Sequence, residues 1–213
     1  FNGQRDCFAS VLDPMGLTLV YSTYIGGSKN DEAREIRLTG RGLGFAIAGA
    51  SDSQDYPTTP NAFQPSFNGQ IDAVYTEISP YGQGVADLFY STYIGSEDTE
   101  LALCMDCDPG GIAYIGGFTT SPRFPISTNP FQPVYAGNTD GFVFVLNPSL
   151  AGPGGMLYSS FLGGTDTDEV RGIVWEPVTF MFSVTGMTNS VDFPIVMGAM
   201  QPANAGGVDA FIS

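Results

Sequence analysis

The sequence contains no histidine and only seven Lys and Arg residues, against 22 Asp and Glu residues. The lack of histidine excludes His-based catalytic triads, His general bases and His-containing zinc or iron sites within this chain. The net charge of −15 gives a surface that repels nucleic acid and anionic lipid, because both are bound through cationic patches. We therefore expect no nucleic-acid partner.

Long apolar runs are also missing. No stretch has the roughly 18 or more apolar residues that cross a membrane as a helix, so we expect no direct membrane insertion. The first ten residues, FNGQRDCFAS, lack the charged start and apolar run of a signal peptide. The three cysteines cannot all pair within one chain, which excludes the dense disulfide framework of small secreted domains.

Glycine and proline are abundant instead, with 28 and 15 residues among 213. Frequent turns of this kind favour many short strands over long amphipathic helices. Hydrophobic residues make up 43% of the chain, which is enough to bury a substantial core. The composition therefore favours an all-β protein.

An internal repeat governs the whole chain. YSTYIGG at 21–27 returns as YSTYIGS at 90–96 and YSSFLGG at 158–164, at offsets of 69 and 68 residues. The same period relates three FQP-like segments, FQPS at 63–66, FQPV at 131–134 and MQPA at 200–203. It also relates four segments that each contain one aspartate, namely Asp6, Asp72, Asp140 and Asp209. We expect repeats at about 1–66, 67–134 and 135–203 and the start of a fourth at 204–213, within a larger chain.

Each period contains four strand-like runs, rich in β-branched and aromatic residues and bounded by turn residues. In the first period they cover 6–12, 18–25, 35–39 and 44–50, and in the second 72–78, 87–94, 101–107 and 112–118. We expect each period to form one four-stranded antiparallel sheet. Small residues recur at Gly49, Gly117 and Gly186, where a close backbone approach needs no side chain. The sequence thus predicts a β-propeller segment of about three blades.

These markers resemble a known family. D-A-V at 72–74, D-A-F at 209–211, YSTYIGG at 21–27 and D-F-P at 192–194 are similar to the bacterial β-propeller repeats called SBBP repeats. The resemblance implies a large exported or cell-surface bacterial protein, extracellular or periplasmic, and no established catalytic residue. The repeats here are longer, with insertions SPYGQGVAD and NPSLAGPGG between the first two strands of the second and third periods.

Cys104 and Cys107 form a C-x-x-C pair, which in other contexts indicates redox chemistry or half of a zinc site. Here Cys104 aligns with the core positions Ile36 and Ile173, and residues three apart on a strand point to opposite faces. No second C-x-x-C or histidine completes a zinc site. We expect Cys104 to be a buried structural cysteine and Cys7 to be a small buried residue.

Acidic turns follow each Y-S-T-Y motif, and their Glu32, Glu100 and Glu169 align with one another. Such turns supply oxygen ligands for calcium, and the third has the best candidates, Asp166, Asp168 and Glu169. The alternative is a solvated, hydrogen-bonded turn without metal. No other cofactor is expected.

The repeated aspartates allow two interpretations. They could form carboxylate pairs for glycoside chemistry, but a catalytic pair is normally unique in a chain. A residue present in every repeat is typical of a strand cap or an acceptor for turn amides. We expect the structural role.

The connection over 51–70 from the fourth strand to the next blade is long and rich in Pro, Thr, Gln and Phe. Because its FQP segment recurs in place, we expect ordered extended structure with the aromatic buried and Gln bonding backbone groups. The candidate binding surface lies on these loops, at the aromatic residues Tyr56, Phe124 and Phe193. Burial of these aromatics in the core is the alternative.

Three functions follow from these observations. We expect a non-catalytic structural or interaction module, whose partners are other protein subunits or further blades. The alternative is a glycan-binding, lectin-like propeller, although the single tryptophan, Trp175, falls in a strand. A hydrolase or lyase with its site outside this segment is the third, and it depends on fold analogy alone.

Overall fold

The computed structural model describes residues 1–40, 42 and 44–213 and shows an all-β protein. The strands are β1 (Cys7–Leu12), β2 (Leu19–Ile25), β3 (Asp31–Leu38), β4 (Phe45–Ser51), β5 (Asp72–Ile78), β6 (Leu88–Ile94), β7 (Glu100–Cys107), β8 (Ala113–Thr119), β9 (Asp140–Leu146), β10 (Met156–Leu162), β11 (Asp168–Trp175), β12 (Phe182–Thr188) and β13 (Asp209–Ile212). Two short 3-10 turns, η1 (Gly84–Asp87) and η2 (Gly152–Gly155), lie in the two insertions.

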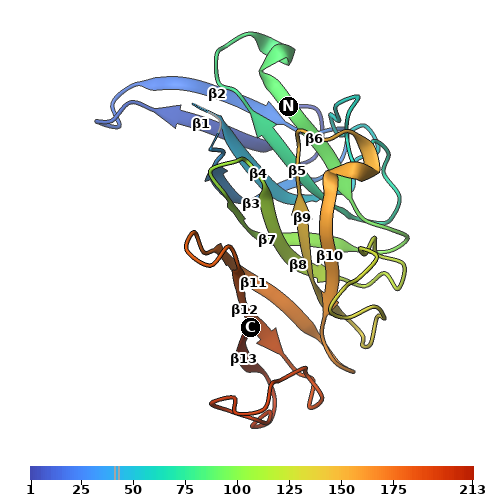
Figure 1. Cartoon of the computed structure of the whole chain (residues 1–213). Helices are drawn as coiled ribbons and strands as arrows, with labels where there is room; N and C mark the ends of the chain where they lie inside the picture. The colour runs from blue at the N-terminus through green and yellow to red at the C-terminus, as the bar shows by residue number, and fades with distance from the viewer. Residues whose placement is uncertain (41, 43) are drawn as a thin grey trace.

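The strands form four antiparallel sheets in which neighbours in sequence are neighbours in space. The first sheet is β1-β2, the second β3-β4-β5-β6, the third β7-β8-β9-β10 and the fourth β11-β12-β13. Figure 1 shows them following one another along the molecule, from the blue N-terminal hairpin to the red C-terminal sheet. The expected all-β fold of blade-like antiparallel sheets is confirmed.

The sheets are half a repeat out of phase with the periods expected from the sequence. A four-stranded sheet takes its first two strands from one period, such as β3 and β4, and its last two from the next, β5 and β6. The expectation that each period is one sheet is therefore wrong. A repeat fixes the number of strands in a sheet, but strand pairing alone decides where one sheet ends.

The long connection over 51–70 explains this phase. It joins β4 to β5, which pair along their whole length from Ser51↔Asp72 to Phe45↔Ile78, so it lies within a sheet and not between blades. The change of sheet occurs at the short acidic turns instead. There a parallel bridge such as Ile71↔Thr99 links the start of β5 to the start of the following sheet.

The recurring glycines have a clear geometric cause. A Cβ added to Gly49, Gly117 or Gly186 would lie 1.8 Å from a backbone oxygen of the neighbouring strand. At the same place the register shifts by one residue, as between Ala33 and Glu35 opposite Gly49. The close backbone approach is confirmed, but it occurs at a β-bulge inside each sheet and not between sheets.

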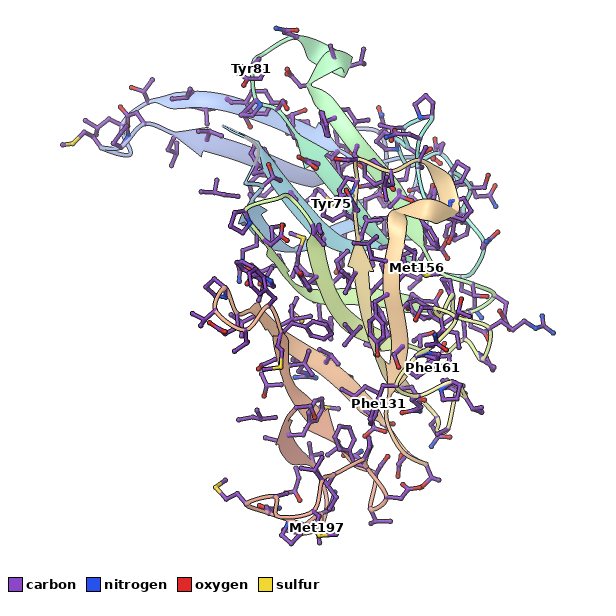
Figure 2. All side chains as sticks on the ribbon, viewed as in Figure 1. Tyr75, Tyr81, Phe131, Met156, Phe161 and Met197 are labelled. Atoms are coloured by element: carbon purple, nitrogen blue, oxygen red, sulfur yellow. The ribbon has the colours of Figure 1, made fainter. Side chains whose placement is uncertain are left out.

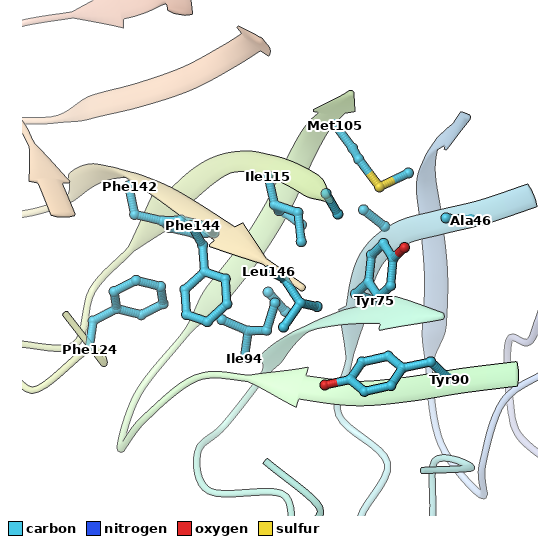
Figure 3. Packing of buried hydrophobic residues seen from close by; sticks show 14 of the residues in the cluster. Ala46, Tyr75, Tyr90, Ile94, Met105, Ile115, Phe124, Phe142, Phe144 and Leu146 are labelled. Carbon is cyan, nitrogen blue, oxygen red and sulfur yellow. The ribbon is translucent and has the colours of Figure 1, made fainter. Parts of the chain in front are cut away.

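The core consists of three apolar clusters, each between two successive sheets. The largest joins the second and third sheets and includes Tyr75, Tyr90, Phe142 and Phe144, all 0% exposed; Figure 3 shows this packing. Successive blades thus stack face to face, with β7 against β3, β4 and β5, and β11 against β7, β8 and β9. As a result, β5 and β9 in the inner sheets are buried on both faces.

Candidate functional site

The repeated aspartates lie at the centre of a hydrogen-bond motif that the inner sheets share. Asp72 Oδ2 accepts bonds from the Asn68 amide at 3.0 Å and from Gln64 Nε2 at 2.8 Å. Gln64 Oε1 in turn accepts the Gly95 amide at 3.0 Å. We call this Asp, Gln and Gly arrangement the Gln latch. Its copy in the third sheet uses Asp140, Gln132 and Gly163, at 2.9 Å for both Gln132 bonds.

The latch confirms the structural role expected for these aspartates. Asp6 and Asp209 also accept turn amides, from Asn2 at 2.6 Å and from Ala205 at 2.5 Å. Asp72 and Asp140 are 0% exposed. A substrate has no access to such carboxylates, so they hold the turn before each strand.

The acidic turns differ from the expected alignment. The side chain that turns back to accept an amide is Asp31 in the first copy, Glu100 in the second and Asp168 in the third. Glu100 is therefore equivalent to Asp31 and Asp168, and its alignment with Glu32 and Glu169 is wrong. The sequence comparison matched residue type, whereas position in the turn decides the role.

The three calcium candidates do not converge on one point. Asp168 is buried and accepts bonds from the Gly164 amide at 2.7 Å and from Ser190 Oγ at 2.8 Å. Glu169 pairs with Arg171 at 2.8 Å, and Asp166 is exposed. Among the described residues, no group of three or more His, Cys, Asp or Glu side chains is placed to hold a metal ion. The geometry of this turn corresponds to the alternative, a hydrogen-bonded turn.

Two carboxylates do meet at each latch glycine. A Cβ on Gly95 would lie 2.6 Å both from Asp72 Oδ1 and from Glu100 Oε2. Burial, with a smaller contribution from the charge of Glu100, raises the pKa of Asp72 to about 7. Burial also raises the pKa of Asp31, Glu100 and Asp140. The Asp72 carboxyl can therefore hold a proton near neutral pH.

Cys104 and Cys107 lie on opposite faces of the third sheet, as expected. Cys104 belongs to the cluster facing the fourth sheet, while Cys107 packs against the cluster facing the second. The β-bulge makes Cys104 equivalent to Glu35 and Gly172, so its expected alignment with Ile36 and Ile173 is wrong by one residue. Burial raises the pKa of both thiols to about 12, which keeps them protonated and unreactive. Cys7 is also buried.

The three loop aromatics expected at a binding surface lie in the core. Tyr56, Phe124 and Phe193 are 3%, 2% and 8% exposed. Tyr56 hydroxyl bonds Thr76 Oγ1 at 2.8 Å, and the Phe124 ring lies 4.6 Å from that of Phe142. Tyr56 and Phe124 therefore form no exposed binding surface, because the loop folds back over its own sheet and turns the aromatic inward. Phe193 is also mostly buried but lines the groove on the fourth sheet.

A groove on the fourth sheet was not expected from the sequence. It has a volume of about 870 Å³, and its lining is mainly apolar. One wall comes from the third sheet, including Phe131 and Phe161, and the other from β12, β13 and the loop over 189–208. Figure 2 labels Phe131 and Phe161 near the end of the third sheet that lies beside the fourth, and Met197 at the far end of the last loop.

The first sheet is open on its outer face. Strand β1 alternates between buried and exposed side chains, with Cys7 and Ala9 against the second sheet and Phe8 pointing outward. Phe8 is 69% exposed and Tyr24 is 63% exposed. The two end sheets therefore present the apolar surface that the inner sheets cover.

No protein-family model matches the chain, and no curated protein matches it either. Among the described residues, no helix has the length and apolar character needed to cross a membrane.

Proposed function

We propose that this chain is a non-catalytic structural and interaction module, a β-propeller segment whose end sheets dock on further blades or on other protein subunits. One observation carries the proposal. Each inner sheet buries both faces against its neighbours, whereas the end sheets leave large apolar side chains in water, such as Phe8 at 69% and Ile212 at 85% exposure. Contiguous apolar surface of this kind marks sites of protein association.

The repeat supports a specific kind of partner. Three successive blade interfaces already use the same alternating apolar positions, so a further blade offers a complementary face. The motifs that resemble SBBP repeats support a place in an exported or cell-surface bacterial protein, or in a larger multi-subunit assembly. The buried repeated carboxylates support a role without catalysis, since they are already used as acceptors in the fold.

Sedimentation velocity over a wide range of protein concentration tests this proposal. We expect reversible association that Phe8→Ser weakens, because Phe8 lies in the open face of the first sheet. Val85→Ser is the matched control, since Val85 is 95% exposed and lies on η1, outside the first sheet. A chain that stays monomeric at every concentration overturns the proposal, as does equal weakening by both variants.

A further inference from the structure

Each change of sheet brings together two acidic side chains that belong to successive sheets. In the central copy, Asp72 is the first residue of β5 in the second sheet, and Glu100 is the first residue of β7 in the third. The other two changes of sheet place the same kind of pair around a glycine, Asp6 with Asp31 and Asp140 with Asp168. A carboxyl pair therefore lies at each junction between blades.

The central pair is buried without a cation. Asp72 and Glu100 are fully buried, and the ion pairs of the described residues include neither of them. The residues opposite them on β4 and β8, Ser51 and Thr119, carry hydroxyl groups and no charge. A Cβ on Gly95 would meet Asp72 Oδ1 and Glu100 Oε2 at the same distance of 2.6 Å. Two buried charges of one sign are costly, and one proton removes half of that charge.

One oxygen of the central pair is free to take up a proton. Asp72 Oδ1 is buried and forms no hydrogen bond within the described part of the chain. In the other two copies the equivalent oxygen accepts a turn amide, from Gly3 to Asp6 at 3.1 Å and from Gly137 to Asp140 at 3.0 Å. A proton on Asp72 Oδ1 therefore displaces no existing hydrogen bond.

The other titratable groups that face the central pair are few. Tyr93 faces it from β6, and burial raises the pKa of the Tyr93 hydroxyl, which keeps it neutral. Glu97 faces it from the acidic turn before β7, where Arg123 lies 3.8 Å from the Glu97 carboxylate and offsets its charge. Asp98 in the same turn accepts a bond from Gln70 Nε2 at 3.1 Å. The charge of the pair itself therefore dominates the junction.

We propose that the carboxyl pair of Asp72 and Glu100 is a pH-sensitive joint between the second and third sheets, closed when the pair holds one proton and loosened when both carboxyls are ionised. Loss of the proton leaves two like charges in a buried site. Their repulsion acts across the junction, because each carboxyl belongs to a different sheet. Burial, with a smaller contribution from Glu100, raises the pKa of Asp72 to about 7, which places the change near neutral pH.

The joint acts on the turns of both sheets. Asp72 Oδ2 accepts the Asn68 amide at 3.0 Å, in the turn that leads into β5. Glu100 Oε2 accepts the Ser96 amide at 2.7 Å, in the turn that leads into β7. Movement of either carboxyl changes the amide bond that it accepts, so we expect the two turns to respond to one titration. This joint lies inside the chain and goes beyond the proposed docking of the end sheets.

Carbon-detected NMR of the intact 213-residue chain, with ¹³C-labelled Asp and Glu and ¹⁵N-labelled amides, tests the joint between pH 4 and pH 9. We expect the Asp72 carboxyl carbon to titrate with a midpoint of about 7, and the Asn68 and Ser96 amides to shift with that same midpoint. Glu100→Gln removes one charge of the pair and should lower the Asp72 midpoint by about one pH unit. Asp98→Asn, the matched control, removes a charge from the same turn outside the pair and should leave the midpoint in place.

Several outcomes would overturn the joint. An Asp72 midpoint that does not move in Glu100→Gln would show that burial alone sets it. Different midpoints for the Asn68 and Ser96 amides in the wild-type chain would show that the titration does not reach across the junction, and this result needs no variant to fold. A monomeric chain with the shared midpoint supports the joint and overturns the proposed function, whereas a self-associating chain with different midpoints overturns the joint alone.

Discussion

At the scale of single residues, the turns between sheets are built around buried carboxylates. Asp72 and Glu100 lie on either side of Gly95, and both are 0% exposed. Hydrogen bonds from amides and from Gln64 offset part of the cost of burying their charge. Burial still raises the pKa of Asp72 to about 7. The folded chain therefore holds a proton on Asp72 at a pH where the unfolded chain has already lost it.

The stability of the chain should therefore fall as the pH rises. Between the ordinary Asp pKa of 3.8 and the folded value of about 7, the folded chain binds more protons than the unfolded chain, and its free energy of unfolding decreases with pH. Urea unfolding at pH 5 and pH 8 measures this difference. We expect Asp72→Asn to reduce it, because the titrating group is removed. An unchanged difference in the variant contradicts the assignment.

Gly95 has no room for a side chain. A Cβ there would lie 2.6 Å from two carboxylate oxygens, so we expect Gly95→Ala to lower the free energy of unfolding by about 1–3 kcal/mol. Gly154→Ala is the matched control, because no atom lies within 4 Å of a Cβ at that glycine. Chemical denaturation of both variants measures the effect, and equal losses would show that the carboxylate pair does not restrict Gly95.

At the scale of elements, the Gln latch connects three parts of one sheet. Gln64 joins the loop to the start of β5 through Asp72 and to the end of β6 through Gly95. Among the described residues, the same side chain in the fourth sheet, Gln201, makes only its donor bonds. The latch is therefore complete where a last strand is present.

This difference predicts unequal costs for the same substitution. Gln64→Ala removes one of the hydrogen bonds to the buried Asp72 and leaves the Gly95 amide without its acceptor, and we expect it to cost about 2–4 kcal/mol of stability. Gln201→Ala loses two donor bonds at an exposed site, and we expect it to cost less than about 1 kcal/mol. Urea unfolding of the two variants compares them directly. Similar losses would contradict the role of the latch in holding the last strand.

The sequence predicts the elements better than their assembly. Strands such as β5 are bounded correctly, because β-branched and aromatic residues end at turn residues on both sides. The phase of the sheets could not be predicted, since the repeat has the same period from any starting point. The equivalence of Glu100 with Asp31 could not be predicted, because the residue changes from Asp to Glu between repeats while its position in the turn is kept. The groove on the fourth sheet depends on loop folding that no local pattern shows.

At the scale of the whole molecule, the chain is a stack of blades with covered inner faces and open ends. The same apolar positions are used between every pair of successive sheets, which is the basis for proposing that each end docks on another blade. Figure 1 shows the first sheet and the fourth sheet at opposite ends of the molecule. With a net charge of −15, the proposed association at these ends works against electrostatic repulsion, which favours directed contacts over non-specific aggregation.

Hydrogen–deuterium exchange of the intact chain at low and high protein concentration tests this account most directly. The last strands of the inner sheets, β6 and β10, form hydrogen bonds with the loops over 53–64 and 121–132. We therefore predict strong protection of these loops at every concentration. The equivalent loop over 190–201 should exchange faster at low concentration and become protected as the chain associates. Protection of all three loops alike at low concentration, or a loop over 190–201 that never responds to concentration, would contradict the account.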